Sequence, residues 1–226
     1  MEAWVKESCG LCGADLHPPA RVLCTGCFED LPRAGPHCDR CGADLAGADT
    51  CGECLRRTPP IDHCLVALDY RYPVDRLIWN LKFRRRMALC VPLARCMEDR
   101  FRATATPLPD LLIGVPMHRW RMAARGFNQS QELARLLGVA LGIDADPRAL
   151  EKTRHTPAQA SLGAGARRAN LQGAFKVLRC VRGRRIAIID DVLTTGSTVA
   201  EMARMLRAAG AVQVQAWVCC RVEPGR

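Results

Sequence analysis

The feature of this sequence that most restricts its fold is a short apolar run that ends abruptly in two acidic residues. Residues 186–189 read Ile-Ala-Ile-Ile, a stretch of β-prone side chains without polar alternation. Such a run is typical of a central parallel strand, which is buried on both faces. Asp190 and Asp191 follow at its carboxyl end, the position where open α/β sheets bind ligands. The sequence therefore predicts a parallel sheet flanked by helices, with a ligand site at this point.

A phosphate-binding turn is predicted just after the two acids. It consists of small, mostly hydroxyl-bearing residues: Thr194, Thr195, Gly196, Ser197 and Thr198. The helical pattern that follows has its apolar residues at Val199, Met202, Ala203 and Leu206. Free N–H groups and the positive end of the helix dipole attract a phosphate there, and glycine permits close backbone approach. In a purely structural alternative, the acids only end a strand and the hydroxyl residues only cap a helix.

The acids and the turn together suit one ligand with two kinds of group. Carboxylates accept hydrogen bonds from vicinal hydroxyls or bind a divalent cation, whereas the turn suits a phosphate monoester, so a ribose 5-phosphate matches both. Residues 188–198 resemble the phosphoribosyl pyrophosphate (PRPP) motif of type I phosphoribosyltransferases. The resemblance implies that Asp190 and Asp191 hold the ribose hydroxyls and that residues 194–198 hold the 5′-phosphate.

The length and composition allow one sizeable core and a small appendage, since the chain has 226 residues and is 49% hydrophobic. The N-terminus lacks a basic region followed by an apolar core, and no apolar run approaches ~20 residues. We therefore expect no signal peptide, no membrane insertion and a cytoplasmic location. Fourteen cysteines in such a chain favour metal ligation or reduced thiols over disulfides.

Four C-x-x-C pairs follow one another near the N-terminus. Each pair can place two thiolates on one ion, because a tight glycine-containing turn points both sulfurs the same way. Two pairs complete a tetrahedral site, so eight cysteines suit two structural zinc ions. The simplest assignment uses Cys9, Cys12, Cys24 and Cys27 for one ion and Cys38, Cys41, Cys51 and Cys54 for the other. An interleaved pairing, and redox or iron–sulfur use, are the alternatives.

The cysteine-rich segment ends at a proline pair. Residues 1–60 have little apolar surface to bury, so metal coordination is expected to supply much of their folding free energy. Thr58, Pro59 and Pro60 favour an extended linker. We therefore predict a double zinc ribbon over residues 1–60 and a phosphoribosyltransferase-like domain over residues 61–226.

The charge is divided unevenly between these two parts. Residues 1–60 hold six Lys/Arg against nine Asp/Glu, a net charge of −3, whereas residues 61–226 hold 27 against 14, a net charge of +13. A field of this sign attracts polyanions, either a phosphate-rich small molecule or a nucleic acid. For any single basic cluster, a solvated arginine-rich surface is the alternative.

Alternating strand and helix patterns continue through the second part. The period of the apolar residues predicts strands over residues 64–70, 110–116 and 212–218, and helices over residues 74–81, 89–101 and 133–141. The loop after the second of these strands carries Arg119, Arg121 and Arg125 ahead of a helix start. This arrangement indicates a second anion site.

A second resemblance lies in residues 115–118 and 125–130, Val-Pro-Met-His and Arg-Gly-Phe-Asn-Gln-Ser. These segments resemble the signature of the ComF family, known from competence (DNA-uptake) proteins. The resemblance implies an N-terminal zinc ribbon joined to a phosphoribosyltransferase domain over nearly the whole chain. Residues 152–175 also resemble the family, at the position of the loop that closes over PRPP. His155 in that segment is a candidate general base, although a histidine in a polar loop is more often only solvated.

These patterns support three hypotheses for function. In the first, the protein is a phosphoribosyltransferase: Mg²⁺ bridges the pyrophosphate and the ribose hydroxyls, and Arg119 and Arg125 stabilise the leaving pyrophosphate. In the second, the site only senses PRPP while the basic domain binds single-stranded DNA beside the DNA-uptake machinery. In the third, the chain is a zinc-ribbon interaction protein with a vestigial site, which the complete set of polar residues in the motif argues against. The sequence identifies neither the acceptor nor the oligomeric state.

Three basic clusters of the second part are candidates for contact with DNA: residues 82–86, 119–121 and 182–185. The first two contain an aromatic ring among the cations. Phosphates would meet the cations, and exposed rings would stack on bases. We therefore expect weak binding of single-stranded DNA with little sequence preference.

Overall fold

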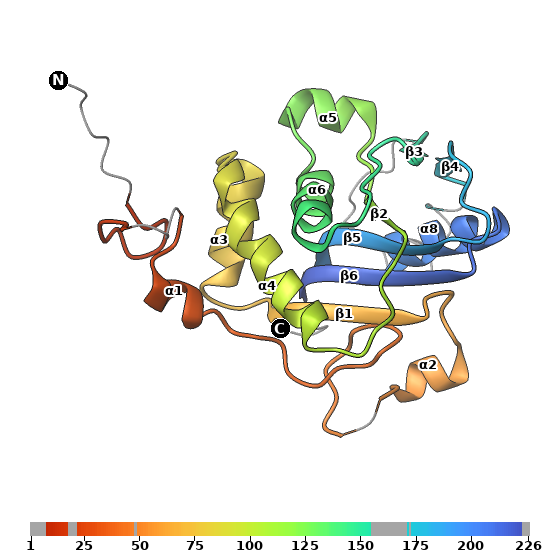
Figure 1. Ribbon diagram of the computed structural model, residues 1–226, viewed down its shortest axis with the longest axis horizontal. Coiled ribbons are helices and arrows are strands. Elements are labelled where there is room, and N and C mark those ends of the chain that lie inside the picture. Colours follow the sequence, from red (N-terminus) through yellow and green to blue (C-terminus); the bar gives the residue numbers. More distant parts are fainter. Residues whose placement is uncertain (1–7, 18–21, 48, 155–170, 172, 223–226) are drawn as a thin grey trace.

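A four-stranded parallel sheet forms the centre of the protein (Figure 1). The computed structural model describes residues 8–17, 22–47, 49–154, 171 and 173–222. Across the sheet the strand order is β1 (His63–Asp69), β6 (Gln213–Arg221), β5 (Arg185–Leu193) and β2 (Leu111–Gly114). All three neighbouring pairs are parallel, so the predicted parallel sheet is confirmed.

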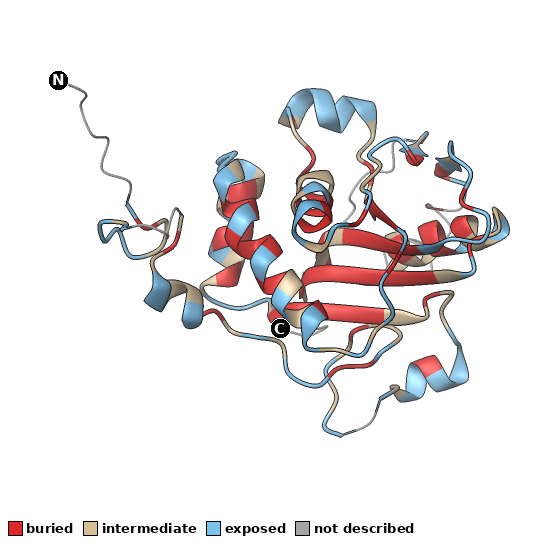
Figure 2. Cartoon of the chain, in the orientation of Figure 1, coloured by how far each residue is buried: buried red, intermediate tan, exposed pale blue. Residues whose placement is uncertain are grey.

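Two layers cover the two faces of this sheet. One layer consists of α3 (Val74–Phe83), a 3-10 turn (Met87–Leu89), α4 (Cys90–Arg102) and α6 (Gln129–Leu141). The other consists of α8 (Ser197–Ala208) and an antiparallel pair formed by β3 (Leu150–Lys152) and β4 (Phe175–Val177). Figure 2 shows the strands buried between these layers. The helices and strands predicted from the apolar period are all present within a few residues.

Strand β5 lies between β6 and β2 and is buried on both faces. Ile186 and Ile188 pack against the α8 layer, whereas Ala187 and Ile189 pack against the layer of α3, α4 and α6. All four side chains are 0% exposed, as expected for the central strand of a sheet covered on both sides. The apolar run of residues 186–189 therefore occupies the place predicted for it.

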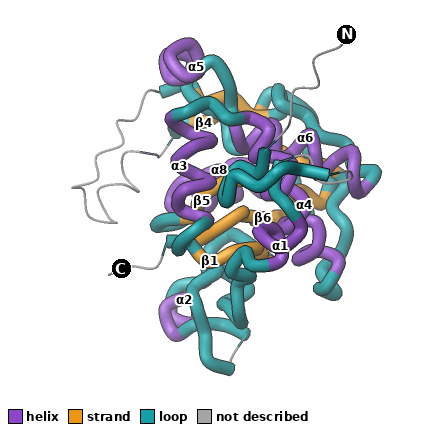
Figure 3. Tube along the Cα trace, turned by 90° about the vertical axis from the view of Figure 1, so that its left-hand side faces the viewer, coloured by secondary structure: helices purple, strands orange, loops and turns teal. Residues whose placement is uncertain are grey.

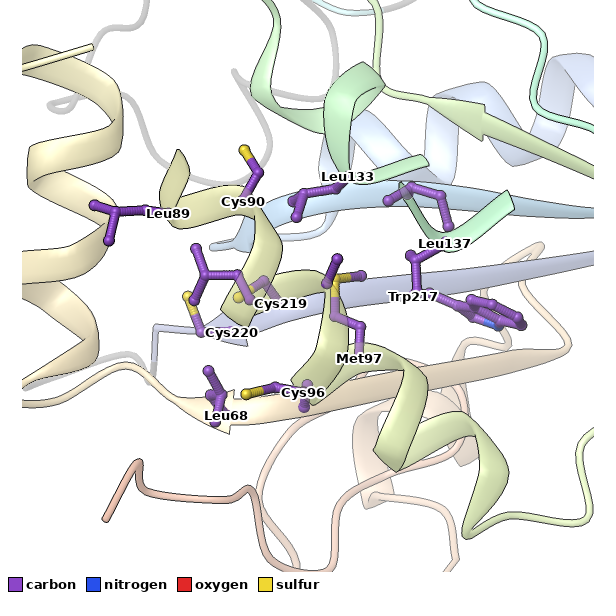
Figure 4. Packing of buried hydrophobic residues seen from close by; sticks show 14 of the residues in the cluster. Leu68, Leu89, Cys90, Cys96, Met97, Leu133, Leu137, Trp217, Cys219 and Cys220 are labelled. Atoms are coloured by element: carbon purple, nitrogen blue, oxygen red, sulfur yellow. The ribbon is translucent and has the colours of Figure 1, made fainter. Parts of the chain in front are cut away.

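The core on the α4 and α6 face contains most of the cysteines outside the C-x-x-C pairs (Figure 4). Trp217 packs on Phe101 with ring centroids 4.3 Å apart, and Cys90, Cys96, Cys219 and Cys220 belong to the same apolar cluster. The buried cysteines of the sheet domain are Cys64, Cys90, Cys96, Cys219 and Cys220, whereas Cys180 is exposed. Buried thiols act here as small apolar groups, and burial raises the pKa of Cys90 and of Cys96 to about 12.

The N-terminal segment lies along the outer edge of β1. It contains α1 (Thr25–Glu29) and α2 (Gly52–Arg56), and Figures 1 and 3 both place α2 beyond the β1 side of the sheet. The Ala34 N–H donates to the Ala67 carbonyl at 3.0 Å, and the Asp69 N–H donates to the Pro32 carbonyl at 2.9 Å. The segment thus pairs with the sheet through its backbone. The domain division at residue 60 stays a prediction.

The arginine-bearing segment predicted as a loop contains a short helix, α5 (Arg119–Arg125). The His118 ring caps it by accepting from the Trp120 N–H, and Gly126 ends it at a φ of 83°. None of its residues is buried, and Figure 2 shows most of its length exposed. Without a buried apolar stripe, this helix gives no periodic signal in the sequence.

Gly114, the last residue of β2, lets α6 begin directly on the sheet. A Cβ atom at this position would lie 2.6 Å from the backbone of Gln131 and 2.6 Å from the Ser130 carbonyl oxygen. Such contacts are too short for carbon, so only glycine permits this approach. The start of α6, which carries polar residues toward the end of β5, therefore depends on Gly114.

We expect Gly114→Ala to lower the free energy of unfolding by about 2 kcal/mol, because the added methyl group must displace backbone. Urea unfolding of the full chain measures the loss. Gly35→Ala is the matched control, since a Cβ atom there meets nothing within 4 Å, and it should stay within about 0.5 kcal/mol of wild type. Equal stability of the two variants would contradict the close approach.

Candidate functional site

A cavity of about 220 Å³ opens where β5 and β2 end. Its walls come from elements that are distant in sequence but meet at the carboxyl edge of the sheet. The charged and polar residues that line it are Lys82, His118, Arg121, Arg125, Asn128, Gln129, Ser130, Lys152, Asp190, Asp191 and Thr198. Open α/β sheets bind ligands at this edge.

Asp191 is buried and is held by two side chains on one oxygen. The Lys82 ammonium lies 2.7 Å from Asp191 Oδ2. Gln129 Nε2 donates to the same oxygen at 3.3 Å. The carboxylate thus joins the last turn of α3 and the first turn of α6 to the end of β5.

Asp190 is less buried than Asp191 and has different partners. Its Oδ1 accepts from Ser130 Oγ at 3.0 Å and from the Asp191 N–H at 3.0 Å. Burial, followed by the adjacent charge of Asp191, raises the pKa of Asp190 to about 7, while Lys82 opposes the rise. A carboxyl group with a pKa in this range changes its charge close to neutral pH.

The polar residues at the start of α6 are positioned by Asn128. Its side-chain oxygen caps the helix by accepting from the N–H groups of Ser130 and Gln131, at 3.0 and 3.3 Å. Its Nδ2 donates to the Val115 carbonyl at 3.0 Å, which joins the cap to the end of β2. This cap fixes Gln129 and Ser130 opposite the two acids.

Three cations face the cavity from the hairpin and from α5. Burial lowers the pKa of Arg125, and the like charge of Arg121 lowers it further. The same two causes lower the pKa of Lys152. Each protonated group is thus less stable here than in water, and an anion bound among the three offsets that loss.

The predicted phosphate-binding turn forms the start of α8. Gly196 is its N-cap in the left-handed conformation, with φ 70° and ψ 0°, and the Ser197 N–H donates to the Thr195 hydroxyl at 3.5 Å. The hydroxyls of Thr195 and Ser197 lie 3.0 Å apart, and Thr198 lines the cavity. Because Thr198 and Asp190 line the same cavity, the start of α8 lies at the site, where helix N–H groups can bind an anion.

Of the nine site residues proposed from the sequence, four line one cavity, and Thr194, Thr195, Gly196 and Ser197 belong to the turn beside it without being among its described lining residues. Asp190, Asp191, Arg125 and Thr198 line one cavity. Arg119 is not among the described residues that line it; its guanidinium stacks on the Trp120 ring at 5.3 Å. Its catalytic role stays a prediction.

Three residues of the site were not proposed for it from the sequence: Gln129, Ser130 and Lys152. Lys82 belongs to a basic cluster for which the sequence leaves open compensation of the helix dipole, contact with pyrophosphate and contact with a nucleic acid. Arg121 was noted as part of an anion site without a role in the reaction. His155, the candidate base, lies outside the described residues.

The eight paired cysteines form two separate clusters of four. One cluster contains Cys9, Cys12, Cys24 and Cys27, and the other contains Cys38, Cys41, Cys51 and Cys54. Within each cluster all four sulfur atoms lie within 4.8 Å of one another. The first two C-x-x-C pairs therefore form one cluster and the last two form the other, as in the simplest assignment and not in an interleaved one.

The geometry of each cluster fits a tetrahedral zinc ion. The Cys12 and Cys24 sulfurs are 3.7 Å apart, and those of Cys41 and Cys51 are 3.6 Å apart. Two thiolates on a tetrahedral zinc with Zn–S bonds of about 2.3 Å are separated by about 3.8 Å. The cysteine clusters therefore have the dimensions of structural zinc sites.

The same backbone hydrogen bond to sulfur occurs in each of the two clusters. Cys24 donates its N–H to the Cys9 sulfur, and Cys51 donates to the Cys38 sulfur, each at 3.3 Å. Burial raises the pKa of both thiols, but such N–H donors outweigh it and lower the pKa of Cys9 to about 6 and that of Cys38 to about 7. These two thiols are thereby prepared for the thiolate form that zinc binds.

Comparison with known families identifies both parts of the chain. Residues 6–55 match the double zinc ribbon domain, and residues 122–225 match the phosphoribosyl transferase domain. The fold and the cysteine clusters therefore define a protein that joins a zinc ribbon to a phosphoribosyltransferase domain.

Relatives of similar length narrow this class to one family. The chain is 37% identical over 222 residues to the DNA utilization protein YhgH of Salmonella typhi, which covers 96% of this chain and 98% of that protein. It is 34% identical over 221 residues to Competence protein F of Haemophilus influenzae, with coverages of 94% and 96%. The chain belongs to the ComF family, as its sequence signature predicts.

Solved structures add only a distant likeness. A purine phosphoribosyltransferase from Pyrococcus horikoshii is 18% identical, covers 71% of this chain and 88% of that chain, and has a TM-score of 0.33. A likeness this weak supports no inference about the site. Within the part of the chain that the structure describes, no helix is long and apolar enough to cross a membrane.

We expect the purified protein to contain two zinc ions per chain, measured by elemental analysis. Cys27→Ser removes one of four ligands from the first cluster and should lower the count to about one. Cys180→Ser, an exposed cysteine outside both clusters, should leave it at two. A wild-type count near one, or equal loss in both variants, would contradict two independent sites.

Proposed function

We propose that this protein binds PRPP, together with Mg²⁺, in the cavity at the carboxyl end of β5. The observation that carries the proposal is the convergence of two carboxylates, a phosphate-binding turn and three cations around one cavity. PRPP presents the matching groups: ribose hydroxyls, a phosphate monoester and a pyrophosphate.

Each part of the ligand has a proposed partner. The carboxylates accept hydrogen bonds from the ribose hydroxyls, and the N–H groups and hydroxyls of residues 194–198 hold the 5′-phosphate. Arg121, Arg125 and Lys152 hold the pyrophosphate, with Arg119 as a further candidate from the sequence. The lowered pKa values of Arg125 and Lys152 support this role, because a polyanion favours their charged forms.

Mg²⁺ suits this site through its oxygen ligands. The ion commonly binds one or two carboxylates together with the phosphate oxygens of a substrate, which the acids of the cavity and a pyrophosphate would provide. When bound, Mg²⁺ would supply positive charge to the leaving pyrophosphate.

We further propose phosphoribosyl transfer as the reaction class. The bond between the anomeric carbon and pyrophosphate breaks with its electron pair on the pyrophosphate, and a bond to a nitrogen nucleophile forms. The cations stabilise the charge on the leaving group. A catalytically silent PRPP sensor is the alternative, and pyrophosphate release measured with a panel of nitrogenous bases separates the two.

Single-stranded DNA binding is a second proposed function, since relatives are named for DNA utilization and competence. Trp79 and Phe83 on α3 are 48% and 64% exposed, with ring centroids 5.7 Å apart. Trp120 on α5 is 65% exposed, and Arg84 and Arg119 stack on the two tryptophans. Exposed rings among arginines suit bases and phosphates together.

The first two basic clusters are close in space, and the third is separate. The Arg85 side chain donates to the Ala124 carbonyl at 3.0 Å and so links the end of α3 to α5. Residues 182–185 lie instead at the amino end of β5, where Arg185 pairs with Asp110. We assign the DNA face to α3 and α5, beside the cavity.

We expect PRPP with Mg²⁺ to raise the free energy of unfolding by about 2.7 kcal/mol at a hundredfold excess over its dissociation constant. The combined change Asp190→Asn and Asp191→Asn should abolish this gain, because both negatively charged carboxylates of the site are lost. Thermal unfolding with and without ligand measures it.

Asp99→Asn, an exposed acid on α4, is the control and should keep the full gain. A double variant that still responds fully to PRPP would rule out the assignment.

We expect Trp79→Ala to weaken binding of single-stranded oligonucleotides by roughly tenfold without changing its salt dependence, because stacking contributes about 1–3 kcal/mol per base. Arg84→Gln should instead make the log–log salt slope shallower by about 0.7, the value for one phosphate contact. Fluorescence anisotropy of the full chain at several salt concentrations measures both.

Val139→Ala removes an exposed apolar side chain from α6 and should change neither quantity. Absence of binding at low salt in wild-type protein would mean that the basic charge is only a solvated surface.

A further inference from the structure

The two cysteine clusters contain the same five-residue segment. Residues 12–16, here called the first knuckle, and residues 41–45, the second knuckle, both read Cys-Gly-Ala-Asp-Leu. In each knuckle the glycine is left-handed, with φ 75° at Gly13 and 71° at Gly42. The glycine N–H donates in both to the carbonyl of the first cysteine of the pair, at 3.0 and 2.7 Å. The two knuckles therefore have the same local structure.

The surroundings of the two knuckles differ. A Cβ atom on Gly13 would meet nothing within 4 Å among the described residues. A Cβ atom on Gly42 would lie 2.8 Å from Val66 Cγ2 and 3.6 Å from Leu193 Cδ2. The first of these distances is too short for two carbon atoms, so glycine lets the second knuckle lie directly on side chains of β1 and β5. The second knuckle is thus packed against the sheet at a point where the first has no equivalent contact.

Leu193 lies between the second knuckle and the phosphate-binding turn. It is the last residue of β5, is 3% exposed and directly precedes the turn. Its Cδ2 faces Gly42, while its Cδ1 lies 3.8 Å from the place of a Cβ atom on Gly196, the N-cap of α8. Leu193 is not among the described residues that line the cavity. One buried side chain therefore separates the second knuckle from the backbone proposed to hold the 5′-phosphate.

Backbone carbonyls of the second cluster are hydrogen-bonded to the sheet. Arg221, at the end of β6, donates to the Cys41 carbonyl. The Cys64 N–H, near the start of β1, donates to the Asp39 carbonyl at 2.6 Å. Because both donors belong to strands, a shift of the second knuckle away from Leu193 would break these bonds.

A further group of contacts joins the same cluster to the other end of α8. Arg40 lies 3.8 Å from Asp62, and Asp62 also pairs with Arg207 in the last turn of α8. The Val214 N–H of β6 donates to this carboxylate at 2.8 Å. Residues 40–42 thus contact the chain just before α8 and, through Asp62, the last turn of that helix.

We propose that the second knuckle is a positioning element of the PRPP site, which acts through Leu193 to hold the phosphate-binding turn and the start of α8 in the conformation that binds the 5′-phosphate. The first knuckle has the same local structure without this role. The inference rests on the proposed PRPP site and goes beyond it, because it makes affinity for the phosphate depend on the second cysteine cluster.

Alanine variants of the two glycines test this role in the full zinc-loaded chain. Alanine is strained at the left-handed φ of either position, so Gly13→Ala and Gly42→Ala share that cost. Only Gly42→Ala also places a methyl group against β1 and Leu193. It should weaken binding of PRPP with Mg²⁺ by about tenfold, whereas Gly13→Ala should stay within about twofold of wild type. Calorimetric titration, at a temperature where each variant is folded, gives the affinities.

Two fragments of PRPP show which part of the site changes. Ribose 5-phosphate carries the group assigned to the phosphate-binding turn, and inorganic pyrophosphate carries the group assigned to Arg121, Arg125 and Lys152. Gly42→Ala should weaken binding of ribose 5-phosphate as much as that of PRPP and leave binding of pyrophosphate within about twofold. Equal losses for the two fragments would indicate general damage to the site and would overturn the proposal.

Leu193→Ala is an independent variant, since it opens space between the second knuckle and the turn instead of filling it. It should give the same difference between the two fragments. Leu206→Ala, a truncation of another fully buried leucine near the far end of α8, is its control. Both truncations should lower the melting temperature, because each leaves a cavity, but Leu206→Ala should not weaken binding of ribose 5-phosphate. Equal weakening by the two truncations would refute a specific role for Leu193.

Hydrogen exchange of the free protein tests the same role without a ligand. Gly42→Ala and Leu193→Ala should speed exchange of the N–H groups in the first two turns of α8, where the Ala200 N–H donates to the Gly196 carbonyl at 2.9 Å. Gly13→Ala should leave that exchange unchanged. If wild-type protein binds neither PRPP nor its fragments, the proposed function fails, and exchange decides the positioning role by itself. Faster exchange in both variants supports the role, and unchanged exchange refutes it.

Discussion

The site depends on the parallel pairing of β5 with β6 and β2. This pairing aligns Gly114 with Ile189 and Asp190 with Val218, so that side chains from distant parts of the chain meet at one edge. A shift of β5 by one residue would separate the two acids from their partners Ser130, Lys82 and Gln129. The fully buried residues 186–189 prevent such a shift, since it would also exchange the apolar groups that fill two different cores. The same apolar run thus determines the sheet and the orientation of its acids.

The parts of this protein that follow from the sequence are those whose chemistry is local. Residues 186–199 contain a strand, two acids, a turn and a helix start in uninterrupted order, and the structure has each in its expected place. The C-x-x-C pairs are equally local, because each pair makes its own turn and needs only one neighbouring pair. The ComF family was recognisable for the same reason, since its signature lies in short contiguous segments.

The parts that do not follow from the sequence depend on which way a side chain faces after folding. Lys82 stands among other cations at a helix end, and nothing near it in the sequence separates an ion pair with Asp191 from simple compensation of the helix dipole. Arg121 and Arg125 are four residues apart and lie on one face of α5, which turns Arg119 away from the cavity. Because α5 buries no apolar residue, the sequence contains no apolar period from which to predict which residues of this helix face the cavity.

The backbone pairing of residues 32–34 with the end of β1 has a consequence for the behaviour of the molecule in solution. β1 is the outermost strand of the sheet, and an uncovered strand edge can join the edge of another chain and begin aggregation. The covering segment is anchored just beyond this pairing by the second cysteine cluster, which begins at Cys38. A chelator, or oxidation of these thiols, would therefore unfold the small ribbon and also detach residues 32–34 from the edge of β1, which would then be exposed. Loss of metal would then promote aggregation of the whole protein.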